Sequence, residues 1–226
     1  MKPESPVNTL PPVVIALTLL IVGIEIALQL GNQGMIGGPR AVGWRLEWVE
    51  QYGFSARVFE VIVTQGDYSL HLLRRFVTYP FINGDLTQVA FCAALTLALG
   101  KFTAEYYGQI KVLVIYLVAA IAGAVAFGLL VRDPYPLFGG FPPVYGLIGA
   151  YTYALWLRLG TAGQNQLLAF RLIGVLLLIQ LIFGLLFGSS PIWIAELAGF
   201  FGGFAVSLIL APGGWTAFLD RMRQRS

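Results

Sequence analysis

The sequence predicts an all-α polytopic membrane protein that forms a bundle of six membrane-spanning helices. Of its 226 residues, 58% are hydrophobic and 11% are charged, and the mean hydropathy is +0.78. Soluble domains are about 45–50% apolar and about 25% charged. The apolar residues also gather in six runs that approach the roughly 20 residues needed to cross a bilayer. We therefore attribute the net charge of +3 to membrane topology and expect the lipid bilayer, and no nucleic acid, as a partner.

The six runs divide the chain into a membrane domain, residues 13–211, between two short tails. Residues 1–12 are rich in proline, and residues 212–226 are basic. No small-residue cleavage site follows the first run, so we interpret it as a retained span and not as a signal peptide. The expected spans are residues 13–30, 76–99, 112–131, 144–157, 172–187 and 192–210.

Residues 31–75, between the first two spans, are too charged to cross a bilayer but are amphipathic. Trp44, Trp48 and Phe54 favour short helices that lie in the membrane interface. An even number of spans places both termini on one side of the membrane. Lysine and arginine are more numerous on that side, so the positive-inside rule predicts cytoplasmic termini. We expect an integral protein of a bacterial inner (cytoplasmic) membrane.

Glycine patterns predict where the helices pack most closely. Residues 138–151 begin with glycines and prolines, which predicts a loop. Gly146 and Gly149 then lie one helical turn apart, which gives a helix a bare face for close packing in lipid. Gly199 and Gly203 form a second small-residue pair in the last span. We expect this span to pack against the helix that carries Gly146.

Two segments carry a family resemblance. Residues 138–151 read Phe-Gly-Gly-Phe-Pro-Pro-Val-Tyr-Gly-Leu-Ile-Gly-Ala-Tyr, and residues 78–92 read Thr-Tyr-Pro-Phe-Ile-Asn-Gly-Asp-Leu-Thr-Gln-Val-Ala-Phe-Cys. They resemble the rhomboid family of intramembrane serine proteases, with its Gly-x-Ser-Gly-x-x-Tyr-Gly-Leu-x-Gly and Thr-x-x-Phe-x-His-Gly-Asp-x-x-His-x-x-x-Asn patterns. The family serine falls at Phe141 or Pro142. In the second pattern, the two histidines and the asparagine are replaced by Asn83, Gln88 and Cys92.

Further matches spread the resemblance over about residues 13–212. Trp44 and Arg45 resemble a Trp-Arg pair that rhomboids carry in the loop after their first helix. Residues 100–108 resemble a Gly…Glu…Gly pattern that follows the second helix of the family. The sixth helix of the family carries Ala-His-x-x-Gly, and its histidine is the base. Here that position is Gly199.

The resemblance implies a rhomboid-like six-helix fold without catalytic residues. Peptide hydrolysis needs a nucleophile, a base and an oxyanion hole. No serine occurs between Ser69 and Ser189. The only histidine, His71, precedes the second span, and we expect it in the interfacial loop. We also expect no metal site and no cofactor.

The positions that replace the catalytic groups, with their neighbours, are candidates for lining a cavity or binding a client: Asn83, Gln88, Cys92, Tyr145, Glu196 and Gly199. Neutral asparagine and glutamine can hydrogen-bond a backbone carbonyl but cannot take a proton from an alcohol at neutral pH. They suit binding better than catalysis. A lone buried cysteine usually behaves as a small hydrophobe, and we expect this of Cys92.

Two acidic residues lie inside the expected spans. An acidic residue deep in a span costs on the order of 2.5–3.5 kcal/mol, so a partner or a water-lined site is expected. Glu25 lies near the outer end of the first span, and we expect it to reach the interface. Glu196 lies one turn before Gly199. We expect its carboxyl group to hydrogen-bond Tyr145 or Gln88.

Three functions are consistent with these patterns. The favoured one is a rhomboid-like pseudoprotease that binds transmembrane segments of other membrane proteins and chaperones, retains or assembles them. The second is an active rhomboid intramembrane serine endopeptidase with unconventional residues. The third is a small transporter or channel that uses Glu25 and Glu196. The sequence leaves the client and the oligomeric state open.

Overall fold

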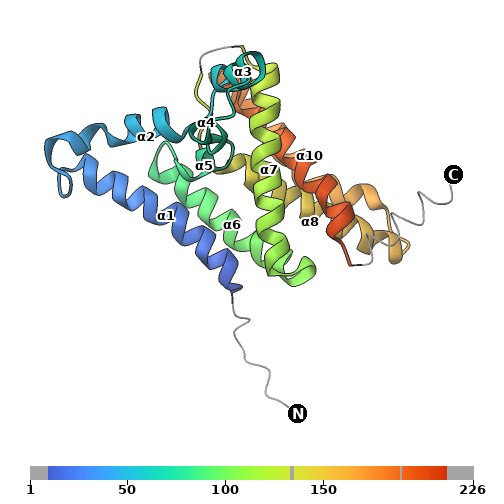
Figure 1. The fold of residues 1–226 in the computed structure, drawn as a ribbon. Helices are drawn as coiled ribbons and strands as arrows, with labels where there is room; N and C mark the ends of the chain where they lie inside the picture. Colours follow the sequence, from blue (N-terminus) through green and yellow to red (C-terminus); the bar gives the residue numbers. More distant parts are fainter. Residues whose placement is uncertain (1–9, 133–134, 189, 213–226) are drawn as a thin grey trace, which may run out of the picture.

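A computed structural model describes residues 10–132, 135–188 and 190–212 of the chain. Within these residues the fold is helical, and the one strand-like pairing is an isolated bridge between Phe54 and Leu137. The long helices form a bundle (Figure 1) and are α1 (Pro12–Asn32), α6 (Leu86–Tyr107), α7 (Gln109–Leu130), α8 (Phe141–Thr161), α9 (Arg171–Phe187) and α10 (Ile192–Leu210).

Five of the described helical segments are long and apolar enough to cross a membrane, and they include every long helix except α8. The first four turns of α8 are almost completely buried. This helix packs against α6, α7 and α10, so protein surrounds it instead of lipid. Its side chains therefore need not be uniformly apolar. The predicted all-α polytopic membrane bundle is confirmed.

Small residues bring α7, α8 and α10 together at the centre of the bundle. A β-carbon added at Gly146 would overlap Ala119 of α7, and one added at Gly203 would overlap the Gly146 backbone. A β-carbon at Gly149 would overlap the Phe200 carbonyl oxygen. Along α8, Pro142 meets Gly199 and Gly149 also meets Phe204, so α8 and α10 run parallel. Pro142 also meets Gly123 of α7 while Gly146 meets Ala119, so α7 runs antiparallel to α8. The bare face predicted on α8, and its packing against the last span, are confirmed.

The limits predicted for the second span, residues 76–99, are wrong, because α6 begins and ends later. Pro80, which has no backbone N–H, lies in a short turn before the helix. The helix starts where the Asp85 carboxylate accepts a hydrogen bond of 2.8 Å from the backbone N–H three residues later. The connection to α7, expected between the predicted spans 76–99 and 112–131, is Gly108 alone, whose φ of +100° favours glycine.

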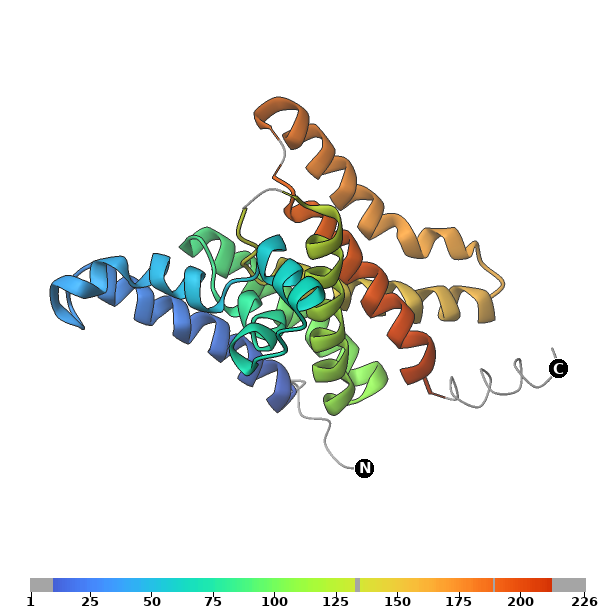
Figure 2. The same ribbon diagram turned by 45° about the horizontal axis from the view of Figure 1, so that its top comes forward.

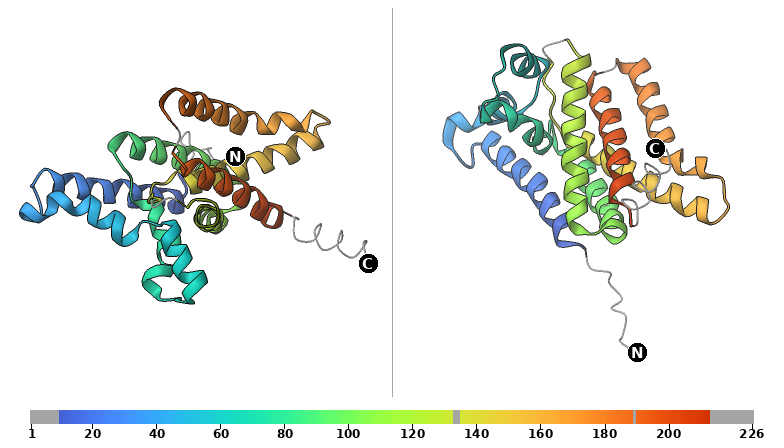
Figure 3. Two further views of the ribbon diagram at one scale, coloured as in Figure 1. Left: turned by 90° about the horizontal axis from the view of Figure 1, so that it is seen from above. Right: turned by 45° about the vertical axis from the view of Figure 1, so that its right-hand side comes forward.

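The segment between α1 and α6 folds into short helices, as predicted. They lie beside α1 and α7 on one side of the bundle (Figure 3). Trp44 packs onto the last turns of α1 and onto the loop that follows them. The short elements are η1 (Gly38–Gly43), α2 (Trp44–Tyr52), α3 (Ala56–Gln65), α4 (Leu70–Leu73), α5 (Arg75–Thr78) and η2 (Tyr79–Phe81).

The ends of the bundle agree with an even number of crossings. The first turn of α1 and the last turn of α10 lie on the same side (Figure 1). The predicted tails, residues 1–12 and 212–226, lie almost entirely outside the described residues. The cytoplasmic placement of both termini stays a prediction.

The α9 helix makes few contacts with the rest of the bundle. Within the described residues, only 11% of this span is buried, against 28% or more in the other candidate spans. Its main contacts are with η3 (Gln166–Phe170) and α8. Figure 2 shows α9 diverging from α10, to which it is joined in sequence. Most side chains of α9 are therefore open to the surroundings of the bundle.

Candidate functional site

The candidate site lies where the chain turns into α8, beside the segment that leads into α6. Gly139 has a φ of +105°, which favours glycine, and its N–H donates to the Tyr79 carbonyl at 3.1 Å. The Gly140 N–H donates to Oδ1 of Asn83 at 3.2 Å. These two bonds fix the turn against the residues that precede α6.

Phe141 begins α8, so the loop predicted for the start of this segment ends earlier than expected. Pro142 and Pro143 lie in the first turn of the helix. Proline is tolerated there because the N–H groups of a first turn have no partner within the helix. Both positions considered for the family serine, Phe141 and Pro142, are thus helical.

Asn83, Gln88 and Cys92 surround this turn, as the resemblance implies. Asn83 is 1% exposed, and its Nδ2 has no hydrogen-bond partner among the described residues. Oε1 of Gln88 accepts from the Gly84 N–H at 2.7 Å, while its Nε2 lies against Gly139. Cys92 is fully buried beneath the same turn. The three substituted positions therefore converge on the start of α8.

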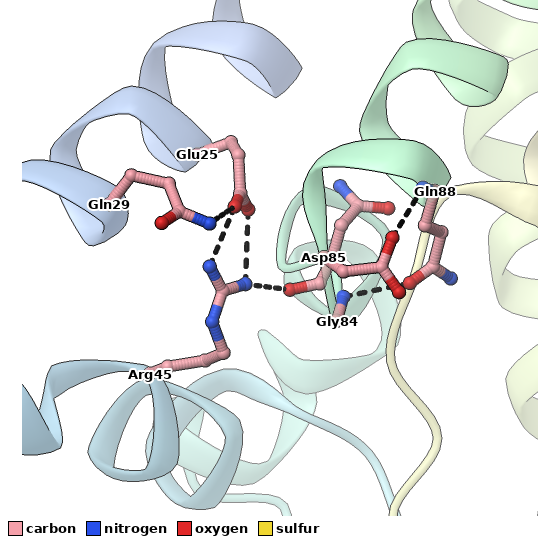
Figure 4. A network of polar contacts seen from close by, with 7 residues as sticks. Glu25, Gln29, Arg45, Gly84, Asp85 and Gln88 are labelled. Carbon is pink, nitrogen blue, oxygen red and sulfur yellow. Dashed lines mark hydrogen bonds and ion pairs between the residues drawn. The ribbon is translucent and has the colours of Figure 1, made fainter. Parts of the chain in front are cut away.

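A buried ion pair supports Asn83 from the side of α1 (Figure 4). Glu25 is 1% exposed, and its two carboxylate oxygens accept from Arg45 of α2 at 2.6 and 3.0 Å. Gln29 donates to the same carboxylate at 2.8 Å. Arg45 also donates to the backbone carbonyl of Asn83. The Glu25 carboxylate is covered by Arg45, whose side chain is 28% exposed. The expectation that Glu25 reaches the interface stays a prediction.

Gly199, at the position of the family base, lies against the first turn of α8. A β-carbon added there would overlap the Pro142 carbonyl oxygen. The positions of the family's catalytic pair are therefore adjacent, but backbone contact leaves no room for a side chain at residue 199. Tyr145 lies one turn further along α8 and is 5% exposed, in a cluster with Ile148 and Phe200.

The two positions of the family's catalytic pair carry neither a nucleophile nor a base. No serine or histidine lies at either position of the pair, and His71 is exposed on α4, outside this site. Pro142 and Pro143 have no N–H, so the helix start offers few backbone donors for an oxyanion. The described residues also hold no group of three or more metal-ligating side chains. The site presents the amide groups of Asn83 and Gln88, which can hydrogen-bond but do not transfer protons at neutral pH, and the buried thiol of Cys92.

An apolar groove of about 780 Å³ extends from Phe141 between α9 and α10. Leu177 and Trp193 are among the apolar residues that line it. Gln88 also lines it and thereby joins the groove to the site at the start of α8. Asn83, Cys92 and Tyr145 are not among the lining residues, since the first two are buried behind the turn before α8 and the third is buried against α10.

Glu196 lines this groove and is 6% exposed. Its carboxylate accepts a hydrogen bond from Nε2 of Gln180. The predicted partners, Tyr145 and Gln88, are therefore wrong, because α9 brings Gln180 to the carboxylate. Glu25 and Glu196 lie in separate polar networks on α1 and α10 and do not form one site.

Sequence reasoning missed two of these contacts. Gln180 is the only polar side chain in residues 172–187. A lone polar residue in an apolar span indicates a polar partner inside the protein. The pairing of Glu25 with Arg45 had a weaker signal. The two residues are 20 positions apart, and their contact depends on how α2 folds back over α1.

Comparisons with known proteins agree with the geometry. The sequence profile of the rhomboid domain matches residues 71–213. The rhomboid protease GluP of Bacillus subtilis (strain 168) is 28% identical over 151 residues, which is 66% of this chain. The same alignment spans only 28% of the length of that relative.

Proposed function

The chain belongs to the rhomboid family, and we propose that it is a pseudoprotease that binds transmembrane segments of other membrane proteins. In this role it scaffolds, assembles or surveys its clients without cutting them. We place it in a bacterial inner membrane, with both termini in the cytoplasm. The proposed client site is the groove between α9 and α10.

The contact between Gly199 and Pro142 is the observation that carries the proposal. A base must reach the nucleophile within hydrogen-bond distance. Here the two positions are in backbone contact, and neither carries a side chain that can act as nucleophile or base. Backbone contact between the two helices fills the space that a base at residue 199 would need, so restoring one side chain would not be enough to restore the catalytic pair.

The groove supports the binding half of the proposal. It is apolar, it begins beside Phe141, and it lies along the loosely packed α9. A membrane-spanning helix also offers apolar side chains, and helices associate in lipid through close van der Waals packing and hydrogen bonds. Gln88 and Gln180 supply hydrogen-bonding groups within that groove.

The peptidase half is tested by labelling the purified protein with a fluorophosphonate probe, which modifies activated serines, beside an active rhomboid as positive control. We expect the control to be labelled and this protein to stay unlabelled. Labelling of this protein would instead support the second candidate, an active endopeptidase, and mapping of the modified residue would identify its nucleophile.

The binding half is tested by photocrosslinking in liposomes that contain a single-span peptide. One photoreactive residue replaces Leu181, which lines the groove. A matched one replaces Ile26 of α1, which is exposed and does not line the groove. We expect crosslinks from position 181 and few from position 26. Equal crosslinking from both positions would show that the peptide contacts the protein nonspecifically and does not bind in the groove.

The transporter alternative has less support, because Glu25 and Glu196 belong to separate networks. It requires ion or proton flux that Glu196→Gln abolishes. We expect vesicles that contain the protein to match empty vesicles in a flux assay.

A further inference from the structure

The two buried carboxylates of the described helices have different partners. Glu25 is neutralised by Arg45 and bonded by Gln29. Glu196 is bonded by one neutral amide, that of Gln180, and no cation is among the residues that line the groove beside it. A buried carboxylate without a compensating charge is costly in an apolar setting. Glu196 is therefore an acidic group that a cation entering the groove would stabilise.

We propose that the groove between α9 and α10 selects transmembrane segments that carry a lysine or arginine, and that this cation pairs with Glu196 in place of Gln180. The inference rests on the proposed function and names its client class. Complementary charge determines the choice of partner, because a segment without a cation leaves Glu196 uncompensated. An acidic segment would add a like charge to the groove.

The geometry fits such a side chain. Glu196 is the fifth residue of α10, so it lies about 6 Å from the helix start at 1.5 Å per residue. A lysine or arginine stem can lie along apolar surface while its charged head reaches a polar group. Leu177 and Trp193 provide apolar surface in the same groove.

Gln180 has the properties of a replaceable partner. It is the only polar side chain in residues 172–187 of α9. This helix has few other contacts with the bundle, so a small movement of α9 separates Gln180 from Glu196 at little cost in packing. A charge-assisted hydrogen bond to a cation is also stronger than one to a neutral amide.

The test measures binding of synthetic peptides to the full chain in lipid nanodiscs. Each peptide is an apolar helix of roughly 20 residues with one variable residue, either Lys, Gln, Glu or Leu. Placing that residue at each of four successive positions covers a full helical turn. We expect the best Lys peptide to bind about tenfold more tightly than the Leu peptide, which corresponds to about 1.4 kcal/mol.

Protein variants assign this preference to one carboxylate. Glu196→Gln should abolish the preference for Lys, whereas Glu60→Gln, which removes an equal charge from the exposed face of α3, should keep it. Gln180→Leu, which removes only the resident partner, should keep or strengthen it. Protection of the single cysteine, Cys92, from maleimide reports that each variant is folded.

Two results would overturn the inference, and they differ in what they say of the proposed function. If all peptides bind equally, or if Glu196→Gln keeps the preference for Lys, the groove binds segments but does not select cations. If no peptide binds the folded protein, the proposed client-binding function fails as well.

Discussion

Removing Arg45 should destabilise the protein strongly, because it leaves a buried carboxylate without its cation. Arg45→Met leaves the Glu25 carboxylate, 1% exposed, with Gln29 as its remaining partner. It also removes the donor to the Asn83 carbonyl. Breaking a buried ion pair by deleting one partner costs about 3–5 kcal/mol. Because the Arg45 side chain is 28% exposed, we expect the lower end, about 3 kcal/mol.

The double variant separates the ion pair from the rest of the network. Glu25→Leu together with Arg45→Met removes both charges, and it leaves the Asn83 carbonyl without this donor and the half-buried Gln29 amide without this acceptor. An unsatisfied buried polar group costs about 1–3 kcal/mol. We expect the double variant to lose about 1–2 kcal/mol, which is less than Arg45→Met alone. The second substitution therefore partly rescues the first.

The single cysteine provides the assay. Cys92 is fully buried beneath the turn before α8, close to where Asn83 holds Gly140. The rate at which a maleimide dye labels it in detergent, with increasing denaturant, reports unfolding of this part of the site. Arg45→Met, Glu25→Leu, the double variant and the parent chain then form a double-mutant cycle.

Additive losses would refute this reasoning. If the double variant loses as much as the two single variants together, Glu25 and Arg45 are not energetically coupled, and the contact contributes nothing beyond its separate side chains. If Arg45→Met costs less than about 1 kcal/mol, the pair behaves like one at a surface. Either result would remove the ion pair as a support of Asn83.

Three further predictions concern packing at Gly199, the two catalytic positions and one buried hydrogen bond. Gly199→Leu should cost at least about 1–3 kcal/mol by overpacking, whereas Gly174→Leu, which meets nothing within 4 Å, should be nearly neutral in the same labelling assay. The combination Phe141→Ser with Gly199→His should stay inactive and unlabelled by a fluorophosphonate, because the histidine has no space; labelling would contradict this. Tyr79→Phe should cost about 1 kcal/mol, because its hydroxyl donates to the Ala120 carbonyl at 3.0 Å, and an unchanged denaturation midpoint would contradict that bond.

Sequence patterns within one or two helical turns predicted which helices pack together. Contacts between residues far apart in the sequence were not predicted. Close packing at Gly146 and Gly199 was predicted correctly, because small residues repeated at helical spacing let two helices approach closely in lipid. The start of α6 was placed too early because apolar residues continue through Pro80, and only the cap at Asp85 ends the irregular segment. The partner of Glu196 was missed because it depends on the angle at which α9 leaves the bundle.

The bundle combines close backbone packing at residue 199 with a loosely packed α9. Glycine at residue 199 lets α10 approach α8 until backbone meets backbone at Pro142. Close backbone contact strengthens helix association in lipid, so we expect α7, α8 and α10 to keep their relative positions. The α9 helix takes little part in this packing and can move without breaking it. Closely packed helices beside a loosely packed one suit the reversible binding of another helix. In our proposal, the carboxylate of Glu196 then determines which helix binds most tightly.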